Sequence, residues 1–173
     1  PAITDEIRLM DASGETDFTI DGEGIAVLPN GDLLVSSETE PAIRQYTADG
    51  ALIAELPVPE HVLVEPAGRA VGNGTFESLA VSPSGTRLFT ALEEPLEGDG
   101  ATDEGRSRLR ILRYDLTDGG SEPAAEYLYL AQPDQDVSEI AAISDEELLV
   151  LERGVSLLEG FSARIFRVSL DAA

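Results

Sequence analysis

Cysteine, lysine and tryptophan are absent from this chain of 173 residues, and histidine occurs once. Without cysteine, the chain can form neither a thiol nucleophile nor a zinc–thiolate centre. Without lysine, it has no Schiff-base residue and no phosphate-binding lysine of the P-loop kind. We attribute the lysine deficit itself to GC-rich codon usage or adaptation to salt rather than to function. The absences nevertheless exclude several kinds of catalysis.

Basic residues are scarce as well. The 11 arginines stand against 34 acidic residues, which gives a formal net charge of −23. The acidic residues are spread along the whole chain, so its surface should repel nucleic acids and anionic membranes and attract cations. No apolar run approaches the length of a membrane span. The first residue is proline rather than methionine, so we expect the chain to be processed or part of a longer protein.

Apolar residues make up 42% of the chain, but they lie in short segments separated by 16 glycines and 10 prolines. This composition favours strands and turns. One pattern occurs three times: a short apolar strand, a tight turn and a returning strand. The copies read "DGEGIAVLPNGDLLVSSE" from Asp21, "ESLAVSPSGTRLFTALE" from Glu77 and "SEIAAISDEELLVLER" from Ser138. Further alternating segments follow each copy. Together they predict four-stranded repeats near 23–57 and 77–130, and a third repeat near 138–170 that lacks its outer strand.

Repeated four-stranded antiparallel units are typical of a β-propeller, whose blades stand around a central channel. We therefore predict an all-β fold, a β-propeller, with residues 1–173 as a single partial domain of about three blades. A closed propeller needs roughly four to eight blades, so the others would come from a longer chain or from an oligomer. The alternative is a β-sandwich with hairpins that are similar by coincidence.

The acidic residues at the strand ends are the candidate site. In an antiparallel blade, the start of the first strand and the end of the second lie at the same rim. Long connections, residues 57–76 and 93–107, belong to this rim too, which is typical of a working face. The rim is therefore predicted to gather Glu23 and Glu38, Glu77 and Glu93, and Glu139 with Glu152 and Arg153.

Crowded carboxylates raise one another's pKa unless a cation intervenes. Oxygen ligands with a single histidine, His61, favour Ca²⁺ or another hard divalent cation over zinc or copper. We expect Glu23, Glu77 and Glu139 to hold it. The alternative is that each carboxylate is only solvated. A serine triad is poorly supported because no G-x-S-x-G occurs, whereas a metal-activated water requires neither group.

Five segments also resemble, in order, those of the phytase-like family, known as "esterase-like activity of phytase": "DGEGIAVLPNGDLLVSSE", "NGTFESLAVSPSGTRLFTALEEPL", "RLRILRYDL", "EYLYL" and "ISDEELLVLER". The resemblance extends over nearly the whole chain. It implies a β-propeller, common in exported bacterial proteins, that hydrolyses phosphate or carboxylic esters. A secreted or periplasmic location is the corresponding expectation.

The resemblance also implies site residues. The family's glutamates correspond to Glu23 and Glu77, the preceding asparagine to Asn73, and its Leu-Glu-Arg segment to Glu152 and Arg153. The sequence departs from the family at Ser78, where glycine is usual, and this puts in doubt how closely a ligand or backbone approaches there.

Together these observations predict a phytase-like or esterase-like hydrolase that acts on a small anionic ester. We expect Asn73 and Arg153 to bind the substrate. The predicted catalytic residues are Glu38, Glu93, Glu152 and Arg153. The alternative function is a non-catalytic, exported binding or interaction module with structural calcium or with no metal.

Overall fold

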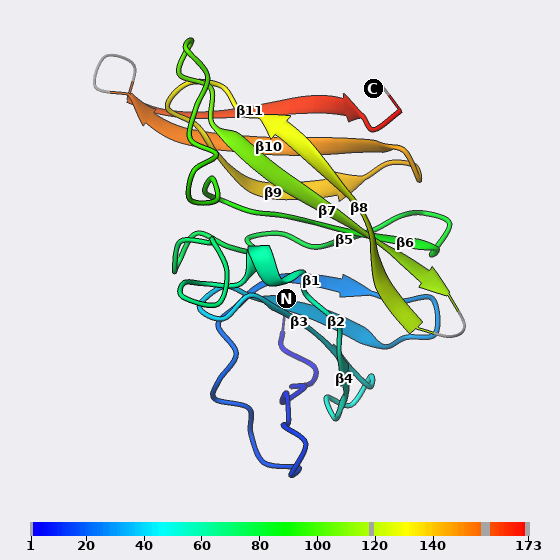
Figure 1. The fold of residues 1–173 in the computed structure, drawn as a ribbon. Coiled ribbons are helices and arrows are strands. Elements are labelled where there is room, and N and C mark those ends of the chain that lie inside the picture. The colour runs from blue at the N-terminus through cyan, green and yellow to red at the C-terminus, as the bar shows by residue number, and fades with distance from the viewer. Residues whose placement is uncertain (1, 118–119, 157–159, 172–173) are drawn as a thin grey trace.

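The computed structural model describes residues 2–117, 120–156 and 160–171, and its strands form three antiparallel sheets stacked one above another (Figure 1). In every sheet the strands are neighbours in the order of the chain. The first sheet contains β1 (Gly22–Val27), β2 (Leu33–Ser37), β3 (Ala42–Tyr46) and β4 (Leu52–Glu55). The second contains β5 (Ala80–Val81), β6 (Arg87–Ala91), β7 (Arg108–Thr117) and β8 (Gly120–Leu130). The third contains β9 (Asp136–Ala142), β10 (Glu147–Ser156) and β11 (Gly160–Ser169).

Tight turns join the first two strands of each sheet. In the first sheet, the Gly31 amide donates to the Leu28 carbonyl, and Gly31 has a φ of 92°. Gly85 repeats this arrangement in the second sheet with Ser82 and a φ of 74°. Both positions need the left-handed backbone that glycine adopts without strain. The predicted hairpins are therefore confirmed, with "PNGD" and "PSGT" as their turns.

Two apolar cores hold the three sheets together. Leu34 and Tyr114 belong to the core between the first and second sheets. Phe89 and Val150 belong to the core between the second and third. Consecutive residues of a strand point to opposite faces, so Leu88 and Phe89 of β6 enter different cores. The second sheet is thus packed on both faces, as a propeller blade is between its neighbours.

The remaining segments are irregular. A 3₁₀ helix, η1 (Glu60–Val62), lies in the connection between the first and second sheets. The N-terminal segment runs away from the first sheet and returns to it (Figure 1). Asp17 anchors this segment through an ion pair of 2.8 Å with Arg44 of β3. Among the described residues, no helix has the length and apolar character needed to cross a membrane.

Candidate functional site

Strand register defines which rim positions are equivalent in the three sheets. In each sheet, the pairing between the first and second strands is irregular shortly after one paired position, because the first strand has extra residues there. This irregularity provides a common reference point. The equivalent pairs are Gly22 with Ser37, Phe76 with Leu92, and Val137 with Glu152.

The residues next to these pairs form the rim. On the first strands, the following residues are Glu23, Glu77 and Ser138, and the preceding ones are Asp21, Thr75 and Asp136. On the second strands, the following residues are Glu38, Glu93 and Arg153. Two backbone hydrogen bonds support this equivalence, from the Glu38 amide to the Asp21 carbonyl and from the Glu93 amide to the Thr75 carbonyl.

Register also corrects two positions expected from the sequence. Ser138, not Glu139, is the counterpart of Glu23 and Glu77, since Glu139 takes the place of Gly24 and Ser78. Similarly, Glu152 is the counterpart of Ser37 and Leu92, and it is Arg153 that stands where the other sheets have glutamates. The acidic residues of the third copy are therefore displaced by one position from the rim.

Glu38, Glu77 and Glu93 converge from the first two sheets. One carboxylate oxygen of each lies within 4.8 Å of the others. Glu38 is only 4% exposed, and within the described part of the chain its Oε1 atom has no hydrogen-bond partner. Burial raises the pKa of Glu77 to about 7, an effect that the charges of Glu93, Glu23 and Glu38 reinforce and Arg153 opposes. Burial likewise raises the pKa of Glu38. We call these three residues the inner group.

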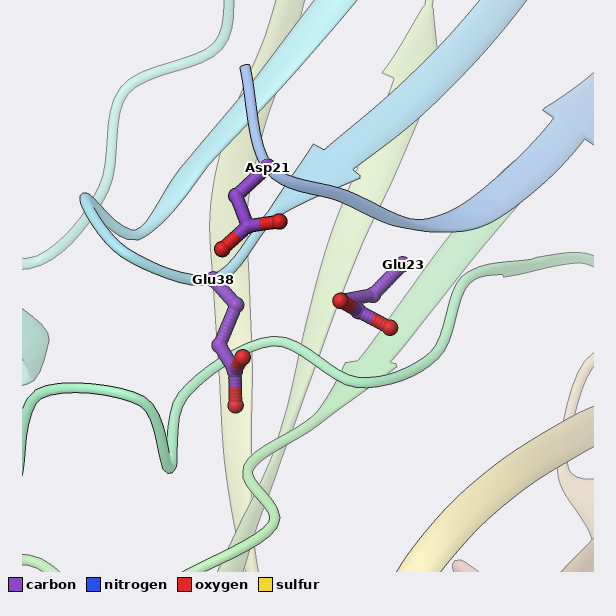
Figure 2. Close-up of side chains that lie close together, drawn as sticks. All are labelled: Asp21, Glu23 and Glu38. Carbon is purple, nitrogen blue, oxygen red and sulfur yellow. The ribbon is translucent and has the colours of Figure 1, made fainter. Parts of the chain in front are cut away.

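A second group shares Glu38. Asp21 directly precedes β1, Glu23 is the second residue of β1, and Glu38 follows β2 (Figure 2). One carboxylate oxygen of each residue again lies within 4.8 Å of the others. The Thr39 hydroxyl donates to Asp21 Oδ2 at 2.6 Å and fixes that carboxylate. Asp21 and Glu23 are exposed, so we call these three residues the outer group.

Arg153 brings positive charge to the inner group from the third sheet. Its Nη2 atom lies 3.2 Å from Glu93 Oε1 and 4.0 Å from Glu77 Oε1, and its side chain is 59% exposed. A cleft of about 660 Å³ opens beside it, lined among others by Glu93, Asp136, Gln135 and Ser162. Burial and the charge of Glu93 raise the pKa of Asp136, which Arg153 opposes. The cleft therefore combines an accessible cation with a carboxyl group that is less acidic than usual.

Thr75 links the first two sheets through the backbone of two of these glutamates. Its buried hydroxyl donates to the Glu38 carbonyl at 2.7 Å, while its own carbonyl accepts from the Glu93 amide at 2.9 Å. Sequence reasoning missed Thr75, Asp21 and Asp136. Asp21 carried a usable signal, because an aspartate two residues before the repeated position also occurs in the third copy.

Replacing Thr75 by valine should lower the free energy of unfolding by about 1–2 kcal/mol, because the buried Glu38 carbonyl loses its donor while the shape of the side chain is kept. Urea unfolding of the variant measures this loss. Thr4→Val, in the exposed N-terminal segment, is the control and should change little. Equal stability of the two variants would mean that the Thr75 hydroxyl does not hold the sheets together.

The remaining predicted site residues lie outside both groups. Glu139 accepts a hydrogen bond from the adjacent Ile140 amide. Glu152 is buried and accepts from the Tyr129 hydroxyl at 2.6 Å and the Gln132 amide at 3.1 Å. It shares a face with Val137, which packs into the core against the second sheet. Asn73 is exposed in the loop before Thr75, with a φ of 61°. Their functional roles stay predictions.

Other polar residues near the rim already have partners. The loop 93–107 is tied to the second sheet through Asp99, which accepts from Arg110 at 2.8 Å and from Arg69 at 3.3 Å. His61 lies 2.7 Å from Glu126. These contacts favour structural roles for Asp99 and His61, in agreement with the weak support for a serine triad.

The stacked sheets and their carboxylate-lined edge define a β-propeller with an acidic rim. A family model matches residues 1–173, the whole chain, and the chain belongs to this family: the phytase-like family, described as "Esterase-like activity of phytase". The resemblance and the fold expected from the sequence are thus confirmed. A search among curated proteins found no match.

Solved structures support the same fold. A crystal structure of glucose dehydrogenase matches with a TM-score of 0.59 and 16% identity, over 89% of this chain and 46% of that enzyme. This chain therefore spans a little under half of that enzyme, and at such low identity the match shows the fold alone. A selenomethionine-substituted virginiamycin B lyase from Staphylococcus aureus has 15% identity over 88% of this chain and 56% of the lyase, but its TM-score of 0.35 is too low to support an argument.

Proposed function

We propose that the acidic rim is the active site of a metal-dependent hydrolase that acts on phosphate or related esters. The observation that carries this proposal is Glu38 Oε1, a buried carboxylate oxygen without a hydrogen-bond partner in the described part of the chain, within the inner group. Burying a charged oxygen is costly unless a donor or a cation compensates for it. The family to which the chain belongs supports ester hydrolysis as the reaction.

The inner group suits a hard divalent cation. Calcium binds oxygen ligands at about 2.4 Å, so two ligands of one ion are at most about 4.8 Å apart. The three glutamates meet this limit with one oxygen each. They supply oxygen atoms only, which favours Ca²⁺ over zinc or copper. When bound, such a cation supplies charge neutralisation for an anionic ester and a water of lowered pKa.

The chain's own residues would bind and orient the ester. Arg153 is accessible from the cleft and offers several donors to anionic oxygens, and its ion pair with Glu93 holds it at the edge of the inner group. Asp136 lines the same cleft. Because its pKa is raised, it can accept a proton from the attacking water closer to neutral pH than an ordinary aspartate.

The experiment is hydrolysis of p-nitrophenyl phosphate and p-nitrophenyl acetate by the EDTA-treated chain, with and without added Ca²⁺. We expect turnover only with Ca²⁺. Glu77→Gln, which removes a ligand charge, should lower it at least about tenfold, equivalent to about 1.4 kcal/mol. Glu104→Gln, in the exposed part of the loop 93–107, is the matched control and should retain it.

Two other outcomes are informative. A melting temperature that rises with Ca²⁺ while neither ester is hydrolysed would favour the non-catalytic module with a structural cation. No effect of Ca²⁺ on melting or turnover would exclude a calcium site at the rim.

We also propose a secreted or periplasmic location, as expected from the family resemblance. Recovery of the native protein only in the cytoplasmic fraction would contradict this location.

A further inference from the structure

We propose that Glu38 bridges two cation sites, so that the rim holds two divalent ions and takes phosphate esters in preference to carboxylic esters. This inference rests on the same carboxylates as the proposed function. The inner and outer groups are separate sets of potential ligands that have only Glu38 in common. A carboxylate has two oxygens and can bind one cation through each. Glu38 therefore stands where a bridging ligand would be needed.

The surroundings of Glu38 support this role. Figure 2 shows its side chain near those of Asp21 and Glu23 from the same sheet. One of its carboxylate oxygens also lies within 4.8 Å of an oxygen of Glu77 and of Glu93. Although the residue is 4% exposed, Oε1 receives no hydrogen bond from the described residues. A buried oxygen without a hydrogen-bond partner, on the one residue that both groups share, indicates a ligand at this position.

Charge favours two ions over one. When all are ionised, the five carboxylates of the two groups and Arg153 have a formal charge of −4. Two divalent cations would cancel this charge, whereas one would leave half of it. Arg153 offsets part of the charge of the inner group, but it pairs with Glu93 and approaches Glu77, not the outer residues. Among the described residues, Asp21 receives only the neutral Thr39 hydroxyl at its carboxylate.

Two bridged cations also define a substrate class. Paired metal ions about 3.5–4 Å apart stabilise both the attacking and the leaving oxygen of an in-line displacement at phosphorus. They would also allow an anionic phosphate to approach a rim that otherwise repels it. A neutral carboxylic ester gains less from the second ion. The acidic rim thus becomes compatible with a phosphate ester only when both groups are filled.

Calorimetric titration of the EDTA-treated chain with Ca²⁺ tests the inference, in about 0.15 M salt to screen unspecific binding. We expect two ions per chain. Asp21→Asn should leave the inner site and Glu77→Gln the outer one, so each should bind a single ion. Glu38→Gln should weaken both sites at least about tenfold. Glu40→Gln, an exposed neighbour of Glu38, is the matched control and should still bind two.

Several results would overturn the bridge. One ion bound by the unaltered chain, or an unchanged stoichiometry in Asp21→Asn, contradicts the outer site. Loss of a single ion in Glu38→Gln shows that Glu38 serves one site only. If Glu38→Gln does not fold, as judged by circular dichroism, Asp21→Asn and Glu77→Gln decide the question alone.

The ester assays separate this inference from the proposed function. Two bound ions without turnover of either ester would support the bridge and contradict the hydrolase. Turnover with one bound ion would support the hydrolase and contradict the bridge. With two ions bound, hydrolysis of p-nitrophenyl phosphate should exceed that of p-nitrophenyl acetate and fall in Asp21→Asn, and the opposite preference would overturn the substrate class.

Discussion

The metal-free chain should lose about 3 kcal/mol of stability as the pH rises from 4.5 to 7, and Glu77 should account for most of the loss. Burial and neighbouring carboxylates raise the pKa of this residue in the folded chain to about 7, against an ordinary value of 4.5. Below pH 4.5 the carboxyl group is protonated in both states. Above it, the unfolded chain ionises first, so unfolding becomes more favourable until the folded chain ionises near pH 7. Glu77 is only 13% exposed, so solvent screening removes little of this effect.

Urea unfolding at a series of pH values in EDTA measures this prediction. Glu77→Gln should give a flatter curve than the unaltered chain, because the amide does not titrate. The curve will keep some slope, since the raised pKa values of Glu38 and Asp136 act in the same direction. Glu104→Gln is the control for loss of one acidic residue and should retain the full slope. If the stability of both variants depends on pH in the same way, the pKa of Glu77 is not raised by burial.

The hairpins of the fold could be predicted from the sequence because their signals are local. Apolar segments on either side of "PNGD" and "PSGT" determine both the turn and the register, since a slip of one residue would expose the apolar face. The returning strand predicted after "PNGD" is β2 (Leu33–Ser37). The first strand of the second sheet is less regular: β5 contains only Ala80–Val81, because extra residues interrupt its pairing after Phe76.

The topology of an antiparallel sheet also brings Glu23, Glu38, Glu77 and Glu93 to one rim, as the sequence predicts. The position of the irregularity in each first strand, however, depends on packing between blades and has no clear sequence signal. Its effect is largest in the third sheet, where it separates Ser138 from Glu139. Contacts between residues that are far apart in the sequence could not be predicted either. Examples are the approach of Arg153 to Glu93 and the link that Thr75 makes between two sheets.

The difference between the predicted and the observed site is largest at Glu152, which the sequence suggested as a catalytic residue. In the structure its buried carboxylate joins the second and third sheets, accepting from the Tyr129 hydroxyl of β8 and the Gln132 amide. Each donor left without an acceptor costs about 1–3 kcal/mol. We therefore expect Glu152→Ala to lower the free energy of unfolding by about 2–4 kcal/mol, as measured by urea unfolding.

Glu152→Gln separates the structural role from a catalytic one. The amide oxygen keeps one acceptor, so the variant should lose less stability than Glu152→Ala and should retain hydrolysis of p-nitrophenyl phosphate once folded. Glu139→Ala is the matched control from the neighbouring strand, because Glu139 is exposed, and it should change stability by no more than about 0.5 kcal/mol. A stable Glu152→Gln variant without turnover would instead support the catalytic role, and it would mean that the third sheet contributes a carboxylate as well as Arg153 to the reaction.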